Sequence, residues 1–363
     1  MAINSNLSFK FSDYINKRPF NQAFPWIGGD LQTLRDTFIF DLLQAKTNKK
    51  ILLPINNILS KKFDGDYLLG FLEFPENLDC LKGIVLITHG LGGSTRRFGL
   101  KRIARKLVNN GFGVLKLNLR GAGSARYLAK GNYSARCSND IILALKFFRQ
   151  LLNSELKDSL KNKEDLPIFG VGLSLGGTIL LNACLDYSSR NRRKLLDGLA
   201  CVSSPLDLLS CSNCIERPRN FLYQKWLMQR LKRQLWDGFK NEGILFPKSS
   251  LSKKIKGLKT IGEFDANFTA PSWGFKSLED YYYQSSPIFR IQNLIKNLPP
   301  TLLIHAKDDP WVPYQSTLNL KNSLNESFDK LTILITNKGG HNGFHSNNGC
   351  WSDEAVKNWL LTI

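Results

Sequence analysis

The fold of this chain is decided by the stretch IFGVGLSLGG, residues 168–177. Its first half is a short apolar run that is typical of a buried strand, and the residues after it follow a helical pattern to Tyr187. Between them lies Gly-x-Ser-x-Gly, in which a sharp turn from strand to helix would expose the hydroxyl of Ser174 as a nucleophile. The flanking glycines suit such a turn because a Cβ there would clash with neighbouring backbone. The alternative is a glycine-rich turn in which Ser174 only caps a helix.

Short apolar runs alternate with amphipathic helical patterns on both sides of this stretch. The runs that predict buried strands are Ile84–Thr88, Val114–Leu119, Ile168–Gly172, Leu199–Ser203, Thr301–His305 and Leu331–Ile335. Helices are predicted over Arg97–Asn110 and Asp140–Leu152, and weaker signals at Ile51–Ile55 and Tyr67–Phe74 predict antiparallel edge strands. Such a succession predicts an α/β fold with a mostly parallel central sheet and helices on both faces.

The alternation stops between about Pro205 and Pro300, where the chain is rich in basic and aromatic residues. We expect residues 1–205 and 298–363 to form one α/β core. Residues 206–297 are expected to form a helical cap insertion over the carboxyl ends of the strands, and not an independent domain.

The composition favours a globular protein with an unusual charge. The 363 residues are 42% hydrophobic, which is enough for a sizeable core and excludes a disordered chain. The formal net charge is +20, and the excess of basic residues lies between positions 81 and 297, without a basic tail. This distribution disfavours nucleic acid as a partner and leaves three explanations: acidic substrates, an anionic membrane surface, or only a codon habit rich in Lys and Asn. The densest run, residues 96–106, holds six cations, for which a solvated outer helix face is the simplest interpretation.

A serine hydroxyl needs a base within hydrogen-bond reach, and the chain has four histidines. His341 lies in a glycine-rich loop after the last predicted strand, and His345, four residues further on, is a weaker candidate. His305 is inside an apolar run and is expected to be a core residue, while His89 belongs to the turn HGLGG after the strand Ile84–Thr88.

The acid that orients the base is expected after the strand Thr301–His305, where Asp308 and Asp309 are adjacent. Successive residues that leave a strand point in opposite directions, so one of the two is expected to face the histidine. The turn HGLGG predicts an oxyanion hole, for which we expect the backbone N–H groups of Leu91 and Leu175. A phosphate-binding turn is the alternative, but the chain has neither a P-loop nor a dinucleotide fingerprint.

Together these motifs resemble the α/β-hydrolases, and specifically the YheT-like branch of esterases and lipases. The matching segments are GDLQTL (29–34), HGLGGS (89–94), NLRG (118–121), GLSLGG (172–177), EDYY (279–282), AKDDP (306–310) and GGH (339–341). The order serine, acid, histidine of that family implies Ser174, Asp309 and His341 as the catalytic triad, because DPWVP resembles its acid loop. One departure is Asp30, which stands where the family often has histidine.

The resemblance implies a serine hydrolase that cleaves carboxylic esters, with short or medium acyl chains or of the monoacylglycerol kind, through an acyl-enzyme on Ser174. The aromatic residues of the expected cap favour a small-molecule ester with an apolar acyl chain. Two alternatives stay open: an acyltransferase or thioesterase with the same triad, and a catalytically idle basic scaffold that binds lipid or nucleic acid.

No cofactor or metal is implied by this chemistry. Cys211 and Cys214 form a lone C-x-x-C without further ligands in suitable spacing, so free thiols are expected. The seven scattered cysteines and the absence of a secretory pattern in Met1–Lys10 predict a cytoplasmic protein. Peripheral contact with an anionic membrane, through the amphipathic basic stretch around Trp226, is an additional hypothesis.

Overall fold

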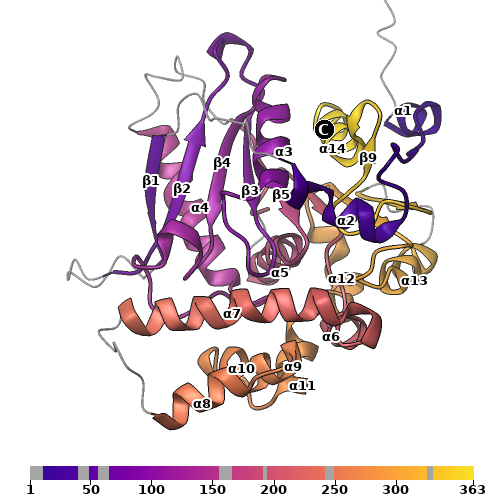
Figure 1. The fold of residues 1–363 in the computed structure, drawn as a ribbon. Coiled ribbons are helices and arrows are strands. Elements are labelled where there is room, and N and C mark those ends of the chain that lie inside the picture. Colours follow the sequence, from indigo (N-terminus) through magenta and orange to yellow (C-terminus); the bar gives the residue numbers. More distant parts are fainter. Residues whose placement is uncertain are drawn as a thin grey trace, which may run out of the picture.

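The computed structural model describes residues 11–39, 49–55, 65–154, 166–190, 194–241, 249–324 and 330–363. Its centre is an eight-stranded sheet with the order β1-β2-β4-β3-β5-β6-β7-β8 (Figure 1). The strands are β1 (Lys49–Pro54), β2 (Tyr67–Glu73), β3 (Ile84–Thr88), β4 (Gly113–Asn118), β5 (Ile168–Leu173), β6 (Gly198–Val202), β7 (Thr301–Ala306) and β8 (Leu331–Thr336). Strands β1 and β2 pair antiparallel at one edge, and β3 to β8 are mutually parallel.

The predicted fold class is therefore confirmed, and each predicted strand lies within two residues of the observed one at either end. One local difference concerns Ser203, which was expected to end β6. Its φ is 49°, which is left-handed and incompatible with a strand, so β6 ends at Val202. The polar stretch from Asn153 to Asp165, which the sequence predicts as a linker, falls mostly outside the described residues.

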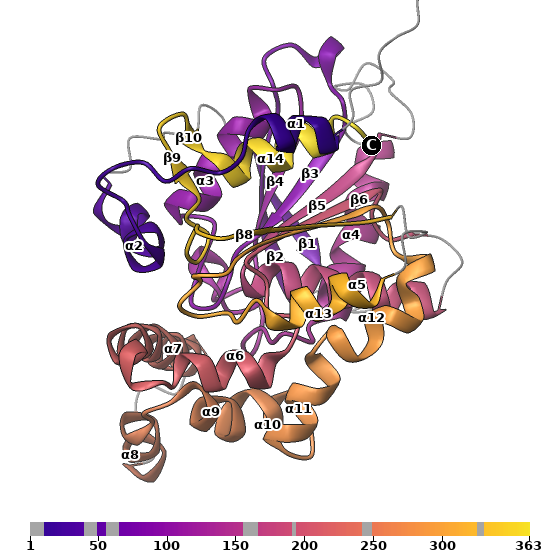
Figure 2. The same ribbon diagram turned by 90° about the vertical axis from the view of Figure 1, so that its right-hand side faces the viewer.

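Helices cover both faces of the sheet (Figure 2). On one face lie α1 (Phe11–Lys17), α3 (Phe98–Val108) and α14 (Trp351–Leu360), and on the other lie α4 (Ser138–Asn153), α5 (Leu175–Arg190), α12 (Ile288–Leu294) and α13 (Gln315–Ser323). Each face has its own buried core, around Ile103 and Trp359 on the first and around Phe148 and Ile179 on the second. A further helix, α2 (Gly29–Phe38), lies beside α3, and a short hairpin of β9 (His345–Ser346) and β10 (Gly349–Cys350) precedes α14.

The segment 206–297 is helical, as expected. Its helices before α12 are α6 (Leu208–Ile215), α7 (Phe221–Asn241), α8 (Ser249–Gly257), α9 (Ile261–Phe264), α10 (Ala270–Ser272) and α11 (Leu278–Ser285). Buried Leu227, Leu231, Ile255 and Phe264 form a small core of their own, joined by Val312 from the loop after β7. The last helix of the segment, α12, packs against α5 instead and belongs to the layer beneath the sheet.

Two cations of residues 96–106, Arg102 and Lys106, do not belong to the solvated face that the sequence favoured. Arg102 lies partly buried between α2 and α14, where it pairs with Asp36 and Asp353, and Lys106 pairs with Glu354 at 2.7 Å. That expectation is wrong for these residues because two other elements of the fold cover this side of α3. None of the helices in the described part of the chain has the length and apolarity needed to cross a bilayer.

Candidate active site

Ser174 lies in the turn between β5 and α5 with a left-handed φ of 55°. Its N–H donates to the carbonyl of Val202 at 2.8 Å, and its own carbonyl accepts from the N–H of Gly177 at 2.9 Å. A Cβ on Gly172 would lie 2.2 Å from the Cα of Gly177, and one on Gly176 would lie 2.6 Å from a carbonyl oxygen of β3. The two glycines thus let strand and helix approach closely enough for the turn, while Ser174 itself has the strained conformation.

A chain of two hydrogen bonds links Ser174 to a histidine and an acid. The Nε2 of His341 lies 2.9 Å from the Oγ of Ser174, and its Nδ1 lies 2.8 Å from the Oδ2 of Asp309. The three residues follow β5, β7 and β8, whose carboxyl ends meet at one edge of the sheet. The arrangement has the geometry of a nucleophile, a base and an acid that orients the base.

Asp309 is buried and fully hydrogen-bonded. Its Oδ1 accepts from the backbone N–H groups of Trp311 at 2.8 Å and Val312 at 2.9 Å. Burial alone would raise the pKa of this carboxyl, but the adjacent imidazoles of His341 and His305 and the N–H of Val312 outweigh burial and lower the pKa. The carboxylate therefore remains charged at neutral pH, as a group that stabilises an imidazolium must be.

The neighbouring Asp308 has a different position. Its Oδ1 accepts from the N–H of Gly340 at 2.9 Å, so it binds the backbone of the histidine loop and not the imidazole of His341. Burial raises the pKa of this carboxyl. The two adjacent acids thus point in opposite directions, as expected for residues that leave a strand.

The other two histidines of the C-terminal region make contacts elsewhere. The ring of His305 lies 3.1 Å from the Oγ1 of Thr317 and 3.0 Å from the carbonyl of Val312, so it is the core residue that was expected. His345 is buried beside Arg35 and Asp36. Among the described residues, His341 is the histidine that contacts Ser174.

The turn HGLGG, residues 89–93, adjoins the serine. A Cβ on Gly90 would lie 3.3 Å from the Oγ of Ser174. The hydroxyl of Tyr133 accepts from the N–H of Gly92 at 2.8 Å and donates to the carbonyl of Gly90 at 3.2 Å, which holds the turn from outside. His89 is a part of this scaffold, because its Nε2 accepts from a backbone N–H of residue 119, and burial lowers its pKa to about 4.

Leu91 and Leu175, the two expected oxyanion residues, both line the cavity at Ser174. Leu175 is the first residue of α5, and the first N–H groups of a helix have no acceptor within the helix. The N–H of Leu91 has no acceptor among the described residues. Their role as oxyanion donors stays a prediction.

Helix α2 holds the histidine loop, a role that the sequence did not predict. The Oγ1 of Thr33 accepts from the N–H of His341 at 2.8 Å. The buried amide of Gln32 accepts from the N–H of His345 at 2.6 Å and donates to the carbonyls of Trp26 at 2.6 Å and His345 at 3.0 Å. The sequence signal that could have indicated this role is the motif Leu-Gln-Thr, residues 31–33. The family resemblance includes this motif but implies no function for it.

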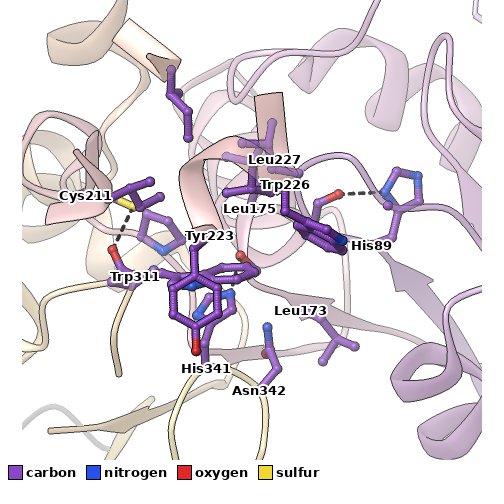
Figure 3. A pocket seen from close by; sticks show the side chains of 18 of the residues that line it. His89, Leu173, Leu175, Cys211, Tyr223, Trp226, Leu227, Trp311, His341 and Asn342 are labelled. Atoms are coloured by element: carbon purple, nitrogen blue, oxygen red, sulfur yellow. Dashed lines mark hydrogen bonds between the residues drawn. The ribbon is translucent and has the colours of Figure 1, made fainter. Parts of the chain in front are cut away.

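The serine opens into a cavity of about 710 Å³ between the sheet and the segment 206–297. Figure 3 shows Tyr223 and Trp311 beside His341, and the ring centroid of Trp311 lies 4.5 Å from that of the imidazole. Apolar side chains of α6, α7 and α9 line the far wall, among them Leu208, Ile215, Leu227, Leu231 and Phe264. The cavity therefore offers an apolar surface next to the nucleophile.

The cysteines lie outside this chemistry. The structure has Cys211 and Cys214 as free thiols, with contacts to the carbonyls of Trp311 and Pro310. Among the described residues there is no cluster of three or more histidine, cysteine, aspartate or glutamate side chains that would suit a metal ion.

Two protein-family models match the chain, one over each part. Residues 79–258 match the model described as "Serine aminopeptidase, S33", and residues 259–363 match the prolyl oligopeptidase family. Both matches fall on the strands and loops that carry the site.

Curated relatives are similar to the chain in sequence, and a solved structure is similar to it in fold. The Escherichia coli protein named "Putative esterase YheT" is 28% identical over 307 residues, which are 82% of each chain. Protein abhd-3.2 of Caenorhabditis elegans is 28% identical, and the medium-chain fatty acid ethyl ester synthase/esterase 2 of Saccharomyces cerevisiae is 26% identical, over 74% and 75% of this chain. The chain spans 66% and 60% of the length of these two relatives. The Pyrococcus furiosus esterase Pf2001 has the same fold, with a TM-score of 0.51, 14% identity and coverage of 88% of this chain and 91% of that one.

Fold and site together define an α/β-hydrolase, with a serine at the turn after β5 and a histidine and an acid at neighbouring strand ends. The chain belongs to the α/β-hydrolase superfamily.

Proposed function

We propose that this protein is a serine hydrolase that cleaves carboxylic esters through an acyl-enzyme on Ser174. The observation that carries the proposal is the hydrogen-bonded chain from Ser174 through His341 to Asp309, which opens into a largely apolar cavity. The esterase names of its relatives support the same reaction class.

In the proposed mechanism the Oγ of Ser174 attacks the acyl carbonyl while Nε2 of His341 takes its proton. Asp309 holds the imidazole in the tautomer with the proton on Nδ1 and stabilises the imidazolium that forms. The imidazolium then gives its proton to the departing alcohol, which leaves the acyl group on Ser174. Water, activated by the same histidine, releases the acid and restores the serine.

Negative charge develops on the carbonyl oxygen in the first step. We assign the N–H groups of Leu91 and Leu175 to its stabilisation, because the turn at Gly90 adjoins the serine and Leu175 begins α5. Donors that are fixed before the reaction contribute roughly 3–4 kcal/mol each to the stability of such a transition state. Tyr133, which binds the turn at both Gly90 and Gly92, keeps the first donor in place.

The segment 206–297 has the position of a cap over this site. Its helices α6, α7 and α9 form the apolar far wall of the cavity, which fits a short or medium acyl chain better than a polar one. A link between cap and core supports this role: Arg219 and Tyr223 of the cap contact Asp30 of α2 at 2.9 Å and 3.1 Å.

Transfer of the acyl group to an alcohol would use the same intermediate. The yeast relative is named both a synthase and an esterase, so acyl transfer and hydrolysis should be compared directly in this protein. Product analysis in water with added ethanol separates them, because hydrolysis yields the free acid and transfer yields the ethyl ester.

The test of the proposal is hydrolysis of a series of p-nitrophenyl esters with acyl chains of two to twelve carbons. We expect wild type to cleave the shorter members and Ser174→Ala to lose activity by on the order of 10⁴-fold or more. Ser189→Ala, on the exposed side of the same helix, is the matched control and should remain active. Activity of Ser174→Ala within tenfold of wild type would contradict the proposed mechanism.

A further inference from the structure

The wall of the cavity carries a cation whose partners the fold does not supply. Arg97 precedes α3, lines the cavity, and is only partly exposed. Its Cζ lies 4.9 Å from the centroid of the Trp226 ring, which belongs to α7. A guanidinium has five N–H donors, and the stacking on an indole ring satisfies none of them.

The other arginines that line the cavity are paired with carboxylates. Arg102 binds Asp36 and Asp353, and Arg219 binds Asp30 at 2.9 Å. The third lining carboxylate, that of Asp265, accepts from the hydroxyl of Tyr282 at 3.0 Å. Among the described lining residues, Arg97 is the arginine for which no carboxylate partner is present.

A second cation makes the position of Arg97 still less favourable. The Cζ of Arg230 lies 4.2 Å from the same Trp226 ring, and its Nη1 donates to the carbonyl of Gly92 at 3.4 Å. Burial, and after it the repulsion by Arg230, lowers the pKa of Arg97 to about 10. An anion bound here would relieve both the desolvation of the guanidinium and this repulsion.

The location of Arg97 relates it to the chemistry of Ser174. Arg97 lies four residues after the turn 89–93, and its charge acts on both His89 and Tyr133, the two side chains that hold this turn. A group bound by Arg97 would therefore lie on the side of the cavity where the oxyanion turn adjoins the serine.

We infer that Arg97 forms an anion subsite of the cavity, and that the ester substrate carries a carboxylate or phosphate group that this guanidinium binds. The inference rests on the proposed function, since it concerns the substrate of that reaction. Arginine suits the task because its planar fork of donors matches the oxygens of both groups.

The test compares two pairs of esters that differ in one charged group. The first pair is 1-decanoylglycerol and its 3-phosphate, with the anion on the alcohol side. The second is p-nitrophenyl pentanoate and the p-nitrophenyl monoester of glutaric acid, with the anion on the acyl side. The measured quantity is the ratio of kcat/KM for the anionic member to that for the neutral member.

We expect wild type to prefer the anionic member of one pair, and the pair that shows this preference identifies the source of the anion. Arg97→Met should lower that ratio roughly 10- to 100-fold, the range for a lost hydrogen bond to a charged group. Arg97→Lys should give an intermediate ratio because it keeps the charge without the fork. Arg96→Met, which removes an exposed neighbouring cation, is the control and should leave the ratio as in wild type.

The inference is overturned if wild type prefers the neutral member of both pairs, or if Arg97→Met keeps the wild-type ratio. If Arg97→Met fails to fold, a measurement on wild type decides the question. It compares inhibition by dodecyl phosphate with inhibition by dodecanol. Tighter inhibition by the phosphate supports the subsite, and equal inhibition refutes it. Failure of the proposed function gives a different result, since wild type would then cleave none of the four esters.

Discussion

The two groups at the ends of the proposed proton transfer, Ser174 and His341, are held in place in different ways. The turn at Ser174 is built mainly from its own neighbours, with Gly172 and Gly176 on either side and the following helix start. The loop of His341 depends on side chains far away in the chain, above all Thr33 and Asp308. The nucleophile is thus specified locally, whereas the base is specified by the tertiary structure.

The strongest test of local specification is Gly172→Ala. The added Cβ would lie 2.2 Å from the Cα of Gly177, so β5 and α5 would have to separate. We expect a loss of stability of about 1–3 kcal/mol or more and a loss of esterase activity by several orders of magnitude. Thermal unfolding and ester hydrolysis measure both effects.

The matched control is Gly238→Ala in α7, where a Cβ meets no atom within 4 Å. This variant should be as stable as wild type or more stable by about 0.5–1 kcal/mol, because alanine favours the helix. Equal stability and equal activity of the two variants would show that the turn at Ser174 does not require Gly172.

The next largest effect concerns the two adjacent acids. Asp309→Asn should lower kcat by about 10⁴-fold, because an amide favours the wrong tautomer of His341 and does not stabilise its charge. Asp308→Asn should remain within tenfold of wild type, since an amide oxygen still accepts from the N–H of Gly340. A larger loss in Asp308→Asn than in Asp309→Asn would reverse the assignment.

These contrasts explain how much of the molecule was predictable. Local apolar patterns and short motifs were enough to predict three features: the succession of strands along the chain, the turn at Ser174, and the site loops after β7 and β8. The tasks of Gln32 and Thr33 were not, because hydrogen bonds to residues more than 300 positions away leave no periodic signal. The pairing of Arg102 with Asp36 and Asp353, which are 66 and 251 positions away, was missed because it too leaves no periodic signal.

Long-range support of the histidine is tested by Thr33→Val. The variant leaves the N–H of His341 without its acceptor, so we expect kcat to fall roughly 10- to 100-fold. The KM should change little, because Thr33 is proposed to position the histidine and not to bind the ester. Thr33→Ser restores the hydroxyl and should restore kcat; a loss of stability in Thr33→Val with an unchanged kcat would mean that the contact is only structural.

The smallest effect is the pH dependence of stability. The pKa of Asp309 is lowered by folding, so its contribution is present above the unfolded pKa of about 4 and is lost as the pH falls through the folded value. The pKa of Asp308 is raised, so its contribution is lost as the pH rises through the folded value. The free energy of unfolding, measured with urea at several pH values, tests both directions. As the pH falls, the stability of wild type relative to Asp309→Asn should decrease. Its stability relative to Asp308→Asn should increase. Changes in the same direction would contradict the two environments described for these acids.

The central claim, that Ser174 is the nucleophile activated by His341, is tested most directly by labelling with a fluorophosphonate, followed by peptide mass spectrometry. The account predicts one adduct per chain, located on Ser174, with none in Ser174→Ala and a strongly slowed reaction in His341→Ala. An adduct on another residue, or labelling of Ser174→Ala at the wild-type rate, would contradict it.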